Sequence, residues 1–101
     1  MNFEHINQFV VQGIVSNITE VVQTPNAQYC YIEVISDSIF GIKHQRNYLQ
    51  IKVFNGLVKL IEDIKLSAGD KIRIDGNAAS YKVNGTNTVQ LIAKKIRKKD
   101  K

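Results

Sequence analysis

Alternating apolar and polar residues recur along most of the chain and predict a protein built mainly of β-strands. The clearest alternation lies at residues 48–54. Its apolar set is Leu49, Ile51 and Val53, and its opposite set is Tyr48, Gln50, Lys52 and Phe54. Four further segments are rich in strand-forming residues, at 9–15, 29–35, 71–82 and 88–93. Five strands are therefore expected.

One helix is predicted between the third and fourth of these strands. Asn55 is suited to the N-cap, and Ala68-Gly69 is expected to end the helix. Apolar residues follow Asn55 at helical spacing, at Leu57, Val58, Leu60, Ile61 and Ile64. We expect this stripe to pack in the core rather than to line a ligand groove.

Turn-forming residues divide the strands. Pro25-Asn26 breaks the chain, and Asn84-Gly85 is a strong signal for a two-residue hairpin turn. Residues 36–47 are mixed and polar and are interpreted as a loop. Gly13 and Gly76 lie inside strands, where a small barrel must bend sharply.

This order of elements is that of an OB-fold, an all-β, five-stranded barrel with one α-helix between strands 3 and 4. The chain has 101 residues, which leaves no room for a second domain. We divide it into an OB-fold domain at residues 1–96 and a basic C-terminal tail at residues 97–101.

Composition narrows the class of protein. Hydrophobic residues make up 44% of the chain, yet no apolar run approaches the ~20 residues of a membrane span. The N-terminus lacks the pattern of a signal peptide. Cys30 is the single cysteine, which suits a reducing compartment, and its alternation with Ile32 and Val34 predicts a buried thiol. We expect a cytoplasmic protein without a membrane partner.

The net charge of +5 is unevenly distributed. Residues 94–101 hold six of the 14 basic and one of the nine acidic residues, which leaves eight of each sign in residues 1–93. Such a run adds affinity for phosphates whatever the base sequence. The alternative is a frayed, solvated end that keeps the protein soluble.

Four segments, in this order and spacing, resemble bacterial single-stranded-DNA-binding proteins (SSB) and the primosomal replication protein PriB. Residues 7–13 run from an asparagine to a glycine, as the opening strand of that family does. Pro25-Asn26 falls at the family's Pro-Asn-Gly turn, although Ala27 replaces the glycine. Residues 48–54 resemble its Trp-x-x-x-x-x-Phe strand, and residues 71–76 its strand ending in an acid and a glycine.

The resemblance implies sequence-independent binding of single-stranded DNA in replication, restart or repair, and assembly into a dimer or tetramer. By position, Tyr48 and Phe54 would stack on bases, and Phe40 lies near a third aromatic position. The even spacing independently places Tyr48, Lys52 and Phe54 on one face of a strand. Aromatic rings for bases and a cation for phosphate suit binding without sequence preference. The alternative is that Tyr48 and Phe54 pack under a loop or against another subunit.

Further candidates lie outside the row of Tyr48, Lys52 and Phe54. Arg73 and Tyr81 share a face if the strand is regular, but a bulge at Gly76 would separate them. Tyr29 and Tyr31 share a face too, as surface strand formers or as binding residues. Three more are expected to form a phosphate clamp in the 36–47 loop: Lys43, His44 and Arg46. The basic end contributes Lys94, Lys95, Arg97, Lys98 and Lys99.

The residue inventory argues against an enzyme. His5 and His44 have no cysteine or histidine partners at metal-ligand spacing, and no glycine-rich phosphate loop is present. We expect no cofactor and no metal. The chain ends in a basic run rather than in the acidic tip of SSB, which argues against SSB's way of recruiting replication proteins. Two rival functions remain open, an RNA-binding OB domain and a protein–protein adaptor.

Overall fold

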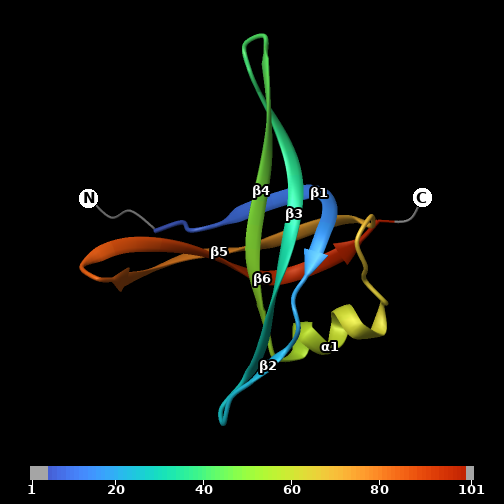
Figure 1. The fold of residues 1–101 in the computed structure, drawn as a ribbon, viewed down its shortest axis with the longest axis vertical. Helices are drawn as coiled ribbons and strands as arrows, with labels where there is room; N and C mark the ends of the chain where they lie inside the picture. Colours follow the sequence, from blue (N-terminus) through green and yellow to red (C-terminus); the bar gives the residue numbers. More distant parts are fainter. Residues whose placement is uncertain (1–4, 100–101) are drawn as a thin grey trace.

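The computed structural model describes residues 5–99, without the side chain of Phe40. Its elements are β1 (Phe9–Ile18), β2 (Val22–Gln23), β3 (Gln28–Phe40), β4 (Lys43–Phe54), α1 (Gly56–Asp63), β5 (Lys71–Val83) and β6 (Thr86–Lys98). Five long strands close into a barrel in the order β1-β5-β6-β4-β3, because β1 also pairs with β3 (Figure 1). The short β2 adds to the edge of β3. Helix α1 follows β4, so the predicted place between strands 3 and 4 is matched only when the two-residue β2 is left out of the count.

β1 closes the barrel by changing partners at a glycine. Residues 9–14 pair with β5, and residues 14–18 pair with β3. A Cβ on Gly13 would lie 2.1 Å from the carbonyl oxygen of Ile35, so no larger residue fits between the two strands. The predicted bend at Gly13 is therefore the point where the barrel closes.

Gly76 marks a second tight contact. A Cβ there would lie 2.0 Å from the carbonyl oxygen of Ile92 and 2.7 Å from the Phe9 ring. The β5–β6 register shifts between Asp75 and Gly76, where Lys94 becomes the extra residue. The predicted bulge is present, but it lies on β6, so the alternation of faces along β5 is kept.

The core is made of the inward-facing residues of all five strands and of α1. Its fully buried members on the strands include Cys30, Ile32, Val34, Ile51, Val53, Ile72 and Ile74. Val58 and Ile61 of the apolar stripe on α1 are buried in this core. The partly buried Leu57, Leu60 and Ile64 pack against it. The predicted core face of the helix is confirmed.

Both predicted ends of the helix need correction. Asn55 precedes the helix, but its side chain makes no cap; its Oδ1 instead accepts a hydrogen bond from the Gln28 amide. The helix ends at Asp63, earlier than Ala68-Gly69, because Lys65 adopts a left-handed conformation with φ of 53°. The Leu66 amide then donates to the carbonyl of Ile61, as in a Schellman motif.

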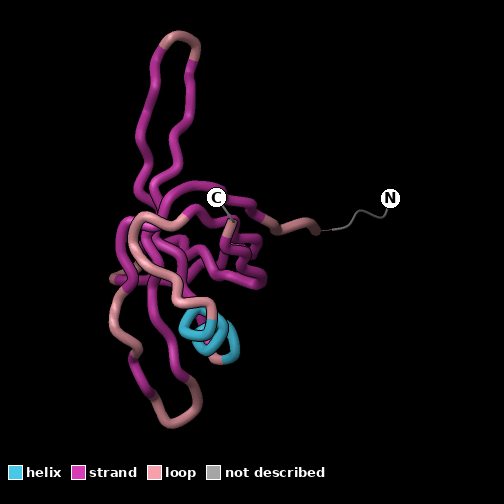
Figure 2. The backbone as a smooth tube through the Cα atoms, turned by 90° about the vertical axis from the view of Figure 1, so that its right-hand side faces the viewer, coloured by secondary structure: helices cyan, strands magenta, loops and turns pink. Residues whose placement is uncertain are grey.

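The expected loop at residues 36–47 is wrong. These residues extend β3 and β4 into a regular hairpin arm that projects from the barrel (Figures 1 and 2). Polar cross-strand pairs hold the arm, including the Asn47 amide donating to the Ser36 carbonyl and Arg46 bound to Asp37. A segment held by polar pairs shows no apolar alternation, which is why its pattern indicates a loop.

The alternative of a frayed basic end does not hold for residues 94–98, which belong to β6. Ile96 is buried opposite Ile74, and Arg97 lies opposite Arg73. The boundary at residue 96 thus falls inside a strand, while residues 100 and 101 lie outside the described part of the chain. Within residues 5–99, no helix is long and apolar enough to cross a membrane.

Candidate nucleic-acid interface

A groove of about 430 Å³ on the outer barrel wall brings together aromatic and polar side chains from four strands. It is lined by Tyr31, Lys52, Phe54, Ala79, Ser80, Tyr81, Gln90 and Ile92. The parallel β4–β6 contact, with Lys52 opposite Ile92, sets one wall beside the other. Three of the predicted site residues, Lys52, Phe54 and Tyr81, therefore meet in one place.

An aromatic cluster surrounds the ammonium of Lys52. Its Nζ lies 4.2 Å from the ring centre of Tyr29, 5.0 Å from Phe54 and 5.6 Å from Tyr31. The Tyr29 ring lies 6.0 Å from the rings of both Tyr31 and Phe54. A cation at these distances is attracted to ring faces. The cluster is therefore a preformed cation–aromatic surface.

Strand register produces the cluster. Tyr29 lies opposite Phe54 and Tyr31 opposite Lys52, and all four side chains are on the outer face because their neighbours Cys30, Ile51 and Val53 are buried. Farther along this face, the carboxylate of Glu33 accepts a hydrogen bond from the Ser16 hydroxyl at 2.8 Å. The acid is thus held toward β1, on the side of β3 away from Lys52.

Tyr48 shares the outer face of β4, as predicted, but it lies outside the groove. It is 60% exposed and sits opposite Ile35 where the hairpin arm begins. It lies six positions before Phe54 on the strand, a distance of roughly 20 Å. Tyr48 and Phe54 would therefore contact bases several nucleotides apart.

The arm residues do not converge as a clamp. Lys43 and Arg46 alternate to opposite faces of the arm, and Arg46 is ion-paired to Asp37 at 3.3 Å. The hydrogen bond and charge of Asp37 raise the pKa of the Arg46 guanidinium. His44 lies opposite Ile39 near the tip. The Phe40 side chain lies outside the described part of the structure.

Arg73 and Tyr81 lie in different regions of the outer surface. Tyr81 reaches the groove and is 49% exposed. Arg73 lies beside β1, opposite Gln12, with its Nε 3.0 Å from Asp75. They share a face of β5, but eight residues, roughly 26 Å of strand, separate them.

The basic end of β6 lies on the same side as Arg73. Lys95 pairs in register with Asp75, Arg97 with Arg73, and the Lys99 amide donates to the Lys71 carbonyl. Lys94 is the bulge residue, beside residues 5–8. Lys98 turns toward the helix, 3.5 Å from Asp70 and 3.4 Å from the Ile64 carbonyl oxygen.

The sequence pattern does not assign a binding role to two parts of this surface. Tyr29 and Tyr31 fit equally well as surface strand formers; their register with Phe54 and Lys52 makes them part of the cluster. Lys71 is missing from the predicted site, although it begins the alternation that continues through Ile72 and Ile74. Away from this surface, burial raises the pKa of the Cys30 thiol, and Glu62 adds to that effect.

Comparison with known proteins supports the fold. No protein-family model matches the chain, and no curated protein is significantly similar to it in sequence. The dimeric N-terminal domain of PriB from Thermoanaerobacter tencongensis superposes with a TM-score of 0.71 and 19% identity, covering 94% of this chain and 98% of that one. Plasmodium falciparum SSB in complex with single-stranded DNA gives 0.75 and 13%, covering 99% and 100%. The predicted OB-fold and its likeness to SSB and PriB are confirmed at the level of fold.

Proposed function

We propose that this protein binds single-stranded DNA without sequence preference, through the groove that joins Lys52, Phe54 and Tyr81. The convergence of these residues from separate strands carries the proposal. Stacked bases gain about 1–3 kcal/mol each on aromatic side chains. Paired bases do not expose these faces, so duplex DNA should bind less well.

The aromatic cluster gives the proposed site its chemistry. Tyr31, Phe54 and Tyr81 offer rings to successive bases, and Lys52 offers its ammonium to the phosphates between them. Every base has an aromatic face, whereas reading a particular base needs fixed hydrogen bonds to its edge. A groove whose walls are mainly aromatic, aliphatic and small side chains therefore favours binding of any sequence.

Two solved proteins of this fold support the proposal: the Plasmodium protein was solved with single-stranded DNA, and the PriB domain is dimeric. We infer that this chain also forms a dimer or tetramer. Within the described part of the chain, residues 9–13 of β1 pair with β5 alone, which leaves the other edge of this segment unpaired. Val10 and Ile14 beside that edge are 48% and 45% exposed. A free strand edge with apolar neighbours suits pairing with a second copy. Sedimentation at micromolar concentration should then show a species larger than 11.4 kDa.

Within the cell, such a protein would act where single strands are exposed, in replication, restart or repair, and would meet replication proteins there. The OB-fold domain would supply binding to the strand. The basic residues at its C-terminal end would add affinity for phosphates.

The deciding experiment compares the affinities for oligo-dT, oligo-U and a DNA hairpin stem at two salt concentrations. We expect oligo-dT to bind most tightly and the stem least. Equal affinity for stem and oligo-dT would contradict base stacking, and tighter binding of oligo-U would favour an RNA-binding domain. Absence of binding to all three would favour a protein–protein adaptor.

A further inference from the structure

The outward-facing side chains where β5 begins and β6 ends are mostly basic. Ile72, Ile74 and Ile96 point into the core from these strands. Their neighbours point outward, and we name this set the basic ladder: Lys71, Arg73, Lys95, Arg97 and Lys99. Asp75 is the acidic residue on this face, bound to Arg73.

The register places four of these cations against one another, while Lys95 lies opposite Asp75. Arg97 lies opposite Arg73, and the hydrogen bond from the Lys99 amide to the Lys71 carbonyl continues the pairing to a second basic pair. Like charges directly opposite across a sheet destabilise it. The ion pair of Arg73 with Asp75 relieves only part of this repulsion. A bound polyanion would relieve the rest, because each of its charges can sit between two cations.

The spacing of the ladder suits a phosphodiester backbone. Lys95 and Arg97 on β6 and Lys99 directly after its end follow at every second residue, about 6.7 Å apart where the backbone is extended. Successive phosphates of an extended single strand have a similar separation. The ladder is also anchored, because Ile96 is buried between Lys95 and Arg97.

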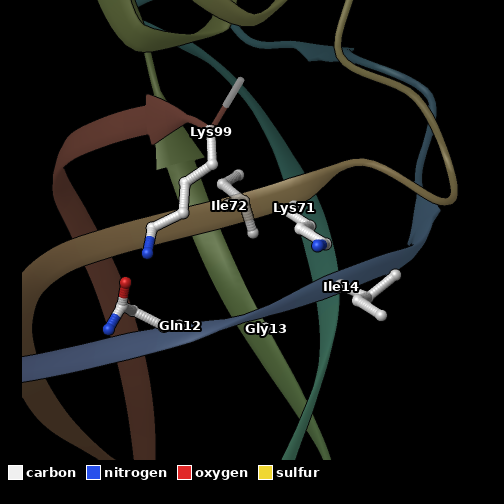
Figure 3. A pocket seen from close by; sticks show the side chains of 6 residues that line it. All are labelled: Gln12, Gly13, Ile14, Lys71, Ile72 and Lys99. Carbon is white, nitrogen blue, oxygen red and sulfur yellow. The ribbon is translucent and has the colours of Figure 1, made fainter. Parts of the chain in front are cut away.

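A shallow hollow of about 270 Å³ lies beside the ladder, between β1 and β5. Figure 3 shows the Lys99 and Gln12 side chains extending toward one another over β5, with Lys71 beside Ile14. β1 contributes the uncharged Gln12 and Ile14 here, so the charge of the hollow comes from the two lysines. An ammonium and an amide that point into one hollow can both donate to a phosphate oxygen.

We propose that the basic ladder is a second site for the DNA backbone, which binds phosphates of the strand whose bases occupy the aromatic groove. The inference rests on the proposed function. Arg73 and Tyr81 are eight residues apart on β5, so the two sites are roughly 26 Å apart along the strand. A short oligonucleotide fills only the groove, and a longer one reaches the ladder.

The test uses three ligands: oligo-dT of about 4 and about 16 nucleotides, which span the range that one OB-fold covers, and an abasic oligodeoxynucleotide, which has phosphates but no bases. The ladder variant carries Arg97→Gln and Lys99→Gln. Its matched control carries Lys59→Gln and Lys65→Gln, two exposed lysines at α1. Thermal melting verifies that both variants fold.

With long oligo-dT, we expect the slope of log affinity against log salt to become shallower by up to about 1.4 in the ladder variant, 0.7 for each phosphate that the variant no longer neutralises. The affinity of the ladder variant for the abasic oligodeoxynucleotide should also fall, while its affinity for short oligo-dT should equal that of the wild type. The control should match the wild type throughout. Lys71→Gln with Lys95→Gln, which removes the charge of the two remaining lysines of the ladder, should repeat the result.

Equal slopes in the ladder variant and its control would contradict the proposal that the ladder binds phosphates. The proposed binding of single-stranded DNA in the groove would be unaffected, provided that the wild type binds oligo-dT. A wild type that binds no oligo-dT would overturn the proposed function itself. Binding of a glutamate oligomer as tight as that of the abasic oligomer, abolished in the ladder variant, would assign the ladder to an acidic protein partner instead.

Discussion

The ammonium of Lys52 lies 4.2 Å from the ring centre of Tyr29, on the neighbouring strand. This contact exists without DNA, so the cation and the rings are held ready on one surface. Ordering a free lysine side chain costs about 1.5–2 kcal/mol. Because Lys52 is held against the rings before binding, the protein would lose little of this side-chain entropy when a ligand binds. Preorganisation of this kind favours affinity over adaptability.

Phe54→Ala should weaken binding of oligo-dT by about 1–3 kcal/mol, because Phe54 lines the groove and offers a ring to a base. Tyr81→Ala should have an effect of similar size. Fluorescence anisotropy with labelled oligo-dT measures both. If Phe54→Ala instead abolishes cooperative melting and leaves affinity unchanged, its contact with Tyr29 serves the fold.

Tyr48→Ala should distinguish short from long ligands. Tyr48 lies outside the groove, roughly 20 Å along β4 from Phe54. We expect the loss of about 1–3 kcal/mol with long oligo-dT only. An equal loss with an oligonucleotide of about 4 nucleotides would show that Tyr48 belongs to the same stacking site.

Lys52→Met keeps an unbranched apolar chain, one atom shorter than that of lysine, and removes the charge. We expect the salt slope for oligo-dT to become shallower by about 0.7, the value for one phosphate, while stability changes by no more than about 1 kcal/mol, the worth of an exposed cation–aromatic contact. Lys59→Met on the exposed side of α1 is the matched control. Identical slopes for the two variants would assign Lys52 a role in packing the rings.

The barrel could be predicted from the sequence because its core strands alternate cleanly and its hairpin at Asn84-Gly85 has the residues that positive φ requires. The β3–β4 arm could not, because polar pairs such as Arg46 with Asp37 hold it. Cross-strand pairs show no periodicity along one strand. The arm depends on pairing, which only the register reveals.

The candidate site could be predicted in part for the same reason. Alternation places Lys52 and Phe54 on one face, since that needs only the parity of one strand. The meeting of Tyr31 with Lys52 and of Tyr81 with Phe54 depends on which strands are neighbours. From its charge, the C-terminal segment is expected to be solvated. In the structure residues 94–98 belong to β6, with Ile96 buried in the core.

Gly13→Ala should destabilise the fold by about 3 kcal/mol or more, because the new Cβ would overlap the Ile35 carbonyl where β1 closes the barrel. Gly56→Ala is the matched control, since a Cβ there has no neighbour within 4 Å. Denaturant unfolding should show a large loss for the first variant and little change for the second. Similar unfolding midpoints would mean that β1 does not approach β3 this closely.

Asp70→Asn should reduce stability at neutral pH, by an amount that depends on pH. The backbone amide of Ser67 donates to Asp70 Oδ2 at 2.8 Å, which lowers the pKa of this carboxyl, and Lys98 lowers it further. A carboxyl whose pKa is lower in the folded protein stabilises the fold above its unfolded pKa, and that contribution disappears as the pH falls through the folded value. The wild type should therefore exceed Asp70→Asn in its urea midpoint at pH 7, and the gap should close as the pH falls below the ordinary aspartate pKa and through the lowered folded value. A gap that stays constant from pH 7 to pH 2 would show that the asparagine changes the turn itself rather than its charge.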